Sequence, residues 1–146
     1  VVGDDAVPRL LPVGFGARAV AEGVVVCVFD DFLAQTVVMR HERFELKGLA
    51  PDWQLYTVFA HVDPAEGIAA DATVGSGRSV VAIAESRTAA PPHLHVSVVA
   101  ARLGLEWARV VGWPELLGAS VAGDIIFLNP PILSRSVPQA PQHTAA

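Results

Sequence analysis

The sequence predicts one all-β domain built on a split, curved antiparallel sheet or sandwich, and three observations support this. Valine, isoleucine, threonine and phenylalanine cluster in short runs, as expected of strands. These runs are separated by turn residues, for example Asp30-Asp31, Pro51-Asp52 and Pro91-Pro92. The 146 residues are 52% hydrophobic and only 17% charged, which suits one domain with a real core and argues against disorder.

Several short strands at regular spacing favour an antiparallel sheet that curves on itself. The expected strands are 16–20, 23–29, 36–41, 55–61, 79–84, 93–99 and 124–128. The region 103–117 has room for a short helix after Pro114, with Gly112 and Gly118 limiting its length. We expect residues 1–133 to form the domain. Residues 134–146 contain prolines and no apolar periodicity, which predicts a flexible tail.

Charge and hydropathy argue against two classes of partner. The net charge is -5 and no lysine or arginine cluster is present, so we expect no nucleic-acid binding. No apolar run approaches the roughly 18–20 residues that a membrane span needs. No signal peptide is recognisable. The lone cysteine, Cys27, lies inside an apolar run, so a buried strand cysteine is expected rather than a reactive thiol.

The segment Pro92-His93-Leu94-His95 carries the sharpest local signal for chemistry. Side chains alternate between the two faces of a strand. His93, His95 and Ser97 would therefore share one face, and Leu94, Val96 and Val98 would share the other, apolar face. Two imidazoles on one face of an apolar strand need polar partners if they are buried, and a metal or a catalytic cleft supplies them. The alternative is two half-exposed histidines on a solvent-facing strand.

Two weaker motifs accompany this pair. His61 ends the strong strand run that begins at Leu55, and a histidine beside a turn is well placed to reach a cleft, although strand ends are also commonly solvated. The N-terminal segment Val1-Val2-Gly3-Asp4-Asp5 is by itself a turn of glycine and aspartate.

Taken in order, these motifs resemble the lysostaphin/LytM-type zinc endopeptidases of bacterial cell walls. Gly3 and Asp5 fit the family's His-x-Gly-x-Asp motif, Tyr56 to Val62 its Tyr-Ala-His strand, and His93-Leu94-His95 its His-x-His strand. The similarity continues through segments 17–26, 36–41, 74–84 and 127–130. It therefore covers nearly the whole chain before the tail.

The resemblance implies roles for individual residues. Asp5 and His95 would be zinc ligands, and His61 and His93 would be catalytic, flanking the metal-bound water and the scissile carbonyl. A zinc ion lowers the pKa of its bound water and polarises a carbonyl, while neutral imidazoles transfer protons or bind the oxyanion. The implied substrates are the peptide cross-links of peptidoglycan. The implied location is periplasmic or extracellular.

One position departs from the family pattern. Val1 stands where the family has its first zinc-ligand histidine, and valine cannot bind metal, so zinc is expected to be weak or absent. Three explanations are open. The ligand histidine is lost and the domain is degenerate, a histidine upstream of this chain supplies the ligand, or another histidine such as His41 takes its place. A degenerate domain would bind the cell wall or regulate a cell-wall amidase.

Two further alternatives concern the tryptophans and the fold. Trp53, Trp107 and Trp113 are expected to pack in the core or loops, with stacking on sugar rings as the alternative. A biotinyl-type carrier shares some β topology. It would need an attachment lysine, but Lys47 lies in a segment without hairpin alternation.

Overall fold

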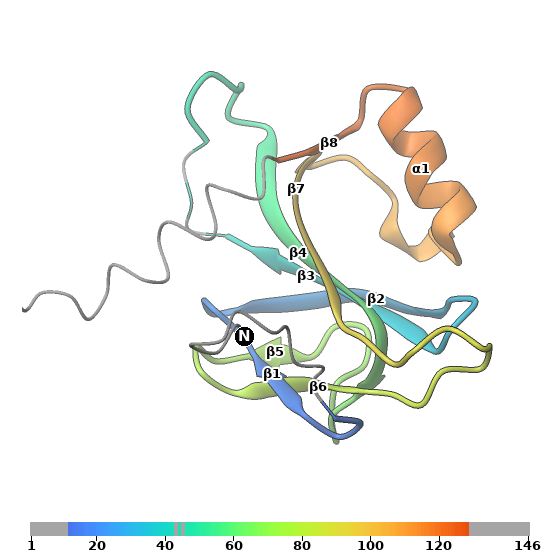
Figure 1. Ribbon diagram of the computed structural model, residues 1–146. Helices are drawn as coiled ribbons and strands as arrows, with labels where there is room; N and C mark the ends of the chain where they lie inside the picture. Colours follow the sequence, from blue (N-terminus) through green and yellow to red (C-terminus); the bar gives the residue numbers. More distant parts are fainter. Residues whose placement is uncertain (1–11, 43, 45, 129–146) are drawn as a thin grey trace, which may run out of the picture.

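The computed structural model describes residues 12–42, 44 and 46–128, and these residues form an all-β fold with one strongly curved antiparallel sheet (Figure 1). The predicted all-β, curved antiparallel architecture is thereby confirmed. The predicted domain boundary at residue 133 and the tail 134–146 lie outside the described residues. None of the described helices is long and apolar enough to cross a membrane.

The strands follow the predicted runs closely, with one helix and one helical turn near the end of the described chain. In chain order the elements are β1 (Gly16–Arg18), β2 (Gly23–Asp30), β3 (Gln35–His41), β4 (Trp53–Pro64), β5 (Thr73–Val74), β6 (Ser79–Ile83), β7 (His95–Arg102), η1 (Trp107–Arg109), α1 (Trp113–Val121) and β8 (Ile125–Phe127). Two bounds matter for the site. Strand β4 runs three residues past His61, and β7 begins at His95, so His93 precedes it.

Strand β4 is the centre of the sheet and the reason for its curvature. The strand order is β1-β6-β4-β3-β2-β5, with β7 also paired to β4 and β8 to β7. Strand β4 pairs with β7 from Trp53 to Ala60 and with β6 from Val62 to Pro64. It therefore exchanges one neighbour for another at His61. Figure 1 shows β7 arching away from the β1–β6 end of the sheet at this point.

The sheet buries apolar side chains on both faces. Along β3 and β4 the side chains alternate between two clusters: Val38 and Val58 belong to the first, and Val37, Met39 and Phe59 to the second. Side-chain alternation across a strand produces this division. Because both faces are covered, these strands read as nearly continuous apolar runs rather than as alternating polar and apolar residues.

Helix α1 covers the first cluster. It begins at Trp113 rather than after Pro114, and Pro114 lies in its first turn, where a missing N–H costs nothing. The prediction that Gly118 limits the helix is wrong, because the helix continues through it. Leu116 is fully buried against the sheet. The helix ends at Val121, and Gly123 follows with a φ of 86°, a left-handed conformation that glycine adopts readily.

The expectations for Cys27 and two of the tryptophans are confirmed. The Cys27 side chain is buried in the first cluster, and burial raises the pKa of its thiol to about 12, which leaves it unreactive. Trp53 and Trp107 are buried, and the Trp107 indole N–H donates to the Tyr56 hydroxyl at 3.2 Å. Trp113 is half-buried and packs against the same cluster.

His41 has a structural role and does not join the other histidines. Its ring is 1% exposed, with Nδ1 3.1 Å from the Glu22 carbonyl oxygen and Nε2 2.7 Å from the Thr57 hydroxyl. In the β3–β4 register His41 lies opposite Leu55, about 20 Å along the strand from His61. The hypothesis that His41 replaces the missing zinc ligand is therefore wrong for this fold.

The buried His41 predicts a pH dependence of stability. Burial lowers the pKa of His41 from its ordinary value of 6.5, and the carbonyl oxygens of Glu22 and Ala21 offset this only in part. The unfolded chain then binds the proton more readily than the folded one, so stability is full above about pH 6.5 and falls as the pH drops below it. Urea unfolding midpoints at about pH 7.5 and 5.5 should show this loss. In His41→Gln the loss should be smaller, and an equal loss in both proteins would contradict the assignment.

A second stability prediction concerns Gly23, which begins β2 beside His41. A Cβ atom placed there would lie 2.3 Å from the Arg40 carbonyl oxygen and 3.0 Å from His41 Nδ1. Since the backbone must shift to accommodate it, Gly23→Ala should destabilise the domain by about 1–3 kcal/mol, as overpacking commonly does. The matched control is Gly75→Ala, whose added atom meets nothing within 4 Å. Chemical denaturation of both variants measures the difference, and equal midpoints would contradict the steric argument.

Candidate functional site

The imidazoles of His61, His93 and His95 gather at the point where β4 leaves β7. The ring centroid of His61 lies 4.9 Å from that of His93 and 6.1 Å from that of His95. The His61 residue is only 8% exposed, whereas His93 and His95 are exposed. The cluster thus combines one buried ring, held by the fold, with two rings open to solvent.

His61 occupies a β-bulge rather than the strand end that the sequence predicts. In the β3–β4 ladder Thr36 lies opposite Ala60 but Gln35 lies opposite Val62, so His61 is the extra residue. Its φ is 68°, a left-handed conformation that a non-glycine side chain adopts at a cost of about 1–3 kcal/mol. Bulges of this kind redirect a side chain and are common beside functional sites.

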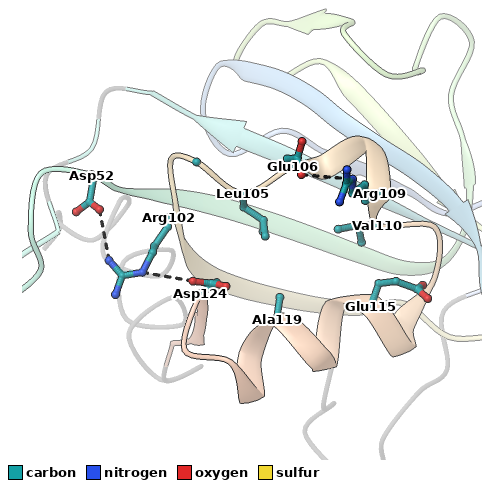
Figure 2. Close-up of a pocket in the computed structure, with 10 residues that line it drawn as sticks. Asp52, Arg102, Leu105, Glu106, Arg109, Val110, Glu115, Ala119 and Asp124 are labelled. Atoms are coloured by element: carbon teal, nitrogen blue, oxygen red, sulfur yellow. Dashed lines mark hydrogen bonds and ion pairs between the residues drawn. The ribbon is translucent and has the colours of Figure 1, made fainter.

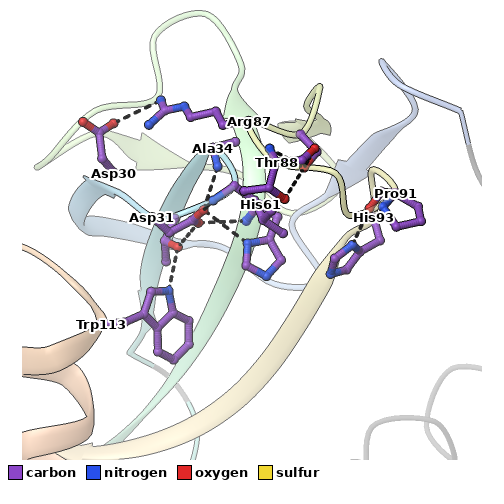
Figure 3. A network of polar contacts seen from close by, with 12 residues as sticks. Asp30, Asp31, Ala34, His61, Arg87, Thr88, Pro91, His93 and Trp113 are labelled. Atoms are coloured by element: carbon purple, nitrogen blue, oxygen red, sulfur yellow. Dashed lines mark hydrogen bonds and ion pairs between the residues drawn. The ribbon is translucent and has the colours of Figure 1, made fainter.

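A buried carboxylate, Asp31, holds His61 on both its backbone and its ring (Figure 3). Asp31 Oδ2 accepts from the His61 backbone N–H at 3.0 Å, and Oδ1 lies 3.2 Å from His61 Nδ1. Oδ1 also accepts from the backbone N–H groups of Leu33 and Ala34, at 2.9 and 2.7 Å. These bonds tie the β2–β3 turn to the bulge in β4.

The Asp31 carboxylate is fully charged under ordinary conditions although its side chain is completely buried. Burial by itself raises the pKa of Asp31, but hydrogen bonds from Thr36, Ala34 and His61 outweigh burial and hold the pKa well below its usual range. The site therefore contains a permanent negative charge, and the imidazole ring of His61 is in contact with it.

The network continues from Asp31 to helix α1. The Thr36 hydroxyl donates to Asp31 Oδ2 at 2.6 Å, and the Trp113 indole N–H donates to the same hydroxyl oxygen at 3.0 Å. Because an indole nitrogen can only donate, the direction of both bonds is fixed. Figure 3 shows Trp113, Asp31 and His61 along this line of contacts.

His93 is held in a different way. Its Nδ1 lies 2.8 Å from the Pro91 carbonyl oxygen, within the segment that precedes β7. The prediction that His93 and His95 share one regular strand is wrong, because the strand begins only at His95. Leu94 and Val96 nevertheless pack against the second apolar cluster, as their positions in the sequence predict.

The structure brings together the three histidines that the sequence singles out and adds residues that it misses. Asp5 and Val1 lie outside the described residues, so their positions are not part of this geometry. The chemical roles implied for His61, His93 and His95 stay predictions. From sequence, Asp31 is predicted only to lie in a turn, Thr36 in a strand and Trp113 in the core or a loop. The one signal for Asp31 in the sequence is an acidic residue in a turn, which is common.

None of His61, His93 and His95 lines either of two cavities formed by the described residues. A cavity of about 610 Å³ lies between α1, η1 and the end of β7 (Figure 2). Both arginines that line it form ion pairs: Arg102 contacts Asp52 and Asp124 at 3.4 and 3.5 Å, and Arg109 contacts Glu106 at 3.3 Å. A second cavity, of about 720 Å³, lies beside β2. The histidine cluster is instead an open surface site.

The donor set within residues 12–42, 44 and 46–128 is too small for a metal centre. No group of three or more His, Cys, Asp or Glu side chains in those ranges is arranged to hold a metal ion. Of the zinc ligands that the resemblance implies, only His95 lies there. The described residues alone therefore do not fit a zinc ion in the family's manner, which needs three protein ligands.

No protein-family model and no curated protein matches the chain.

Proposed function

We propose that this chain is a peptidoglycan endopeptidase-like domain of the lysostaphin/LytM type, which hydrolyses peptide cross-links at the histidine cluster. One observation carries the proposal: the ring of His61 contacts the buried carboxylate of Asp31, and its centroid lies 4.9 Å from that of the His93 ring. Imidazoles next to each other, with one backed by a carboxylate, are suited to moving a proton near neutral pH. The resemblance of the ordered motifs supplies the substrate class.

The residues of the chain itself would do the following. Each Nδ1 nitrogen of His61 and His93 faces an oxygen, so in the neutral rings Nε2 carries the lone pair. One imidazole takes a proton from the attacking water, and the other hydrogen-bonds the developing oxyanion. The exposed Phe32 ring lies 5.4 Å from the His61 ring and offers an apolar contact for a bound peptide.

Backbone strain also supports a retained chemical role. Glycine is the usual residue at a left-handed bulge position, and His61 occupies this one. A purely structural bulge would gain stability from glycine. The fold instead keeps an imidazole there and surrounds it with the Asp31 network.

Zinc belongs to this proposal through Asp5 and His95, but these two ligands fall short of a complete set. The proposed proton transfer therefore depends on the imidazoles of His61 and His93. A periplasmic or extracellular location is proposed with the substrate, because peptidoglycan lies there.

A second candidate function is that of a degenerate domain, which binds cell wall or regulates a cell-wall amidase without cutting. Val1 at the position of the family's first ligand favours it. The two candidates share a binding surface and differ in turnover.

One pair of assays separates them. Purified sacculi are incubated with the chain over a range of zinc concentrations, and both released peptide amines and bound protein are measured. Release of amines supports the endopeptidase. Retention on sacculi without release at any zinc concentration supports the degenerate binder. Neither release nor retention contradicts both and leaves only the fold.

A further inference from the structure

We infer that Asp31 is a positioning residue for His61, fixing the ring as the Nδ1–H tautomer through a carboxylate that Thr36 and Trp113 hold in place. The effect on hydrolysis rests on the proposed function, whereas the tautomer does not. Neither the turn that contains Asp31 nor the ordered motifs assigns this residue a role.

The hydrogen-bond inventory of Asp31 carries the inference. A carboxylate accepts and cannot donate when ionised, so every group within reach must present a hydrogen to it. Leu33 N, Ala34 N and His61 N do so from the backbone, and the Thr36 hydroxyl from a side chain. The His61 Nδ1 atom at 3.2 Å from Oδ1 must therefore carry its hydrogen as well.

The consequence lies at the other nitrogen of the ring. With Nδ1 protonated, Nε2 of the neutral ring holds the lone pair, which is the atom that accepts a proton or binds a partner. Asp31 thus sets which nitrogen of the His61 ring can act.

Rigidity of the carboxylate follows from its neighbours. The Asp31 side chain is completely buried, and the Trp113–Thr36 pair fixes Oδ2 from the direction of α1. A carboxylate anchored at both oxygens cannot rotate away when the His61 ring becomes charged. The ring would therefore keep its orientation throughout a proton-transfer cycle, as a preorganised site requires.

The first test measures the tautomer of His61 in the unmodified protein. Ring ¹⁵N resonances of the histidines are recorded well above neutral pH, and those of His61 are assigned by their loss in His61→Gln. We expect a protonated Nδ1 and an unprotonated Nε2 for His61. The opposite tautomer would overturn the inference, because Nδ1 would then have no hydrogen to give Asp31.

The second test removes the charge and keeps the shape. In Asp31→Asn the amide oxygen can still face Leu33, Ala34 and His61 Nδ1. The buried negative charge is gone, however, and the amide NH2 that replaces Oδ2 cannot accept from the His61 backbone N–H or the Thr36 hydroxyl. Hydrolysis of sacculi should lose at least about tenfold in kcat with little change in KM, the scale of a lost hydrogen bond to a charged group. Gly23→Ala is the matched control: it destabilises the fold far from His61 and should leave kcat unchanged.

The outcomes separate the inference from the proposed function. If the Nδ1–H tautomer is found but Asp31→Asn behaves like Gly23→Ala in kcat, Asp31 is only a structural residue and the inference is overturned. If the unmodified chain cuts nothing, the proposed hydrolysis fails. The tautomer of His61 then still decides whether Asp31 positions the ring.

Discussion

Replacing His93 with alanine is expected to lower the turnover of peptide hydrolysis by about a hundredfold or more, the usual scale for a lost general base or acid. The ring is exposed, and its Nδ1 is bonded to the Pro91 carbonyl oxygen, so the variant removes a group beside the reacting atoms while leaving the core intact. Release of peptide amines from sacculi gives the rate. Thermal unfolding of the same sample should be nearly unchanged, because an exposed side chain contributes little burial.

The control for this variant is Arg109→Ala, which truncates another exposed side chain, on η1 beside the α1 cavity. It should keep full turnover. Cleavage that survives His93→Ala would contradict the role proposed for His93. A large drop in unfolding temperature would instead mean that His93 supports the fold, which its exposure does not suggest.

The strands could be predicted from sequence because their signal is local. Runs such as Val24 to Phe29 are rich in β-branched residues and bounded by turn residues, so both their type and their ends are visible in a short window. Helix α1 was recognisable for a similar reason, since Pro114 marks the first turn of a helix. The apolar clusters then follow from alternation along β3 and β4.

The bulge at His61 could not be predicted, because it is a property of pairing and not of composition. His61 becomes the extra residue only when Gln35 pairs with Val62 and Thr36 with Ala60. Nothing in the run from Leu55 to His61 marks this shift, and a local reading places the strand end at the histidine. The start of β7 could not be predicted for a comparable reason. The chain is still irregular at His93, and pairing with β4 begins only at His95.

Asp31 was missed because its function depends on partners far away in the chain. It lies 30 residues before His61, and Thr36 meets Trp113 across 77 residues. In a short window an aspartate after a strand is an ordinary turn residue. Only the pairing of β3 with β4, which places the β2–β3 turn beside the bulge in β4, brings Asp31 to the His61 ring.

Replacing Val1 with histidine is expected to strengthen zinc binding by about a hundredfold or more. The variant restores the family's first ligand in the sequence, and together with the other two implied ligands, Asp5 and His95, it would complete a three-ligand set. Even groups outside the first coordination shell are commonly worth roughly 10–100-fold in affinity, and a direct ligand should be worth more. Calorimetric titration of both proteins with zinc gives the affinities, and the unmodified chain should bind zinc weakly or not at all.

The matched control is Val2→His, which adds the same imidazole one position away from the family spacing and should gain little. A second control combines Val1→His with His95→Ala, where the gain should disappear because the set is again incomplete. Tight, stoichiometric zinc in the unmodified chain would show that a ligand has been misassigned. An equal gain in Val2→His would show that the added imidazole acts as a loose surface ligand, so that the His-x-Gly-x-Asp alignment of Val1, Gly3 and Asp5 would lose its support.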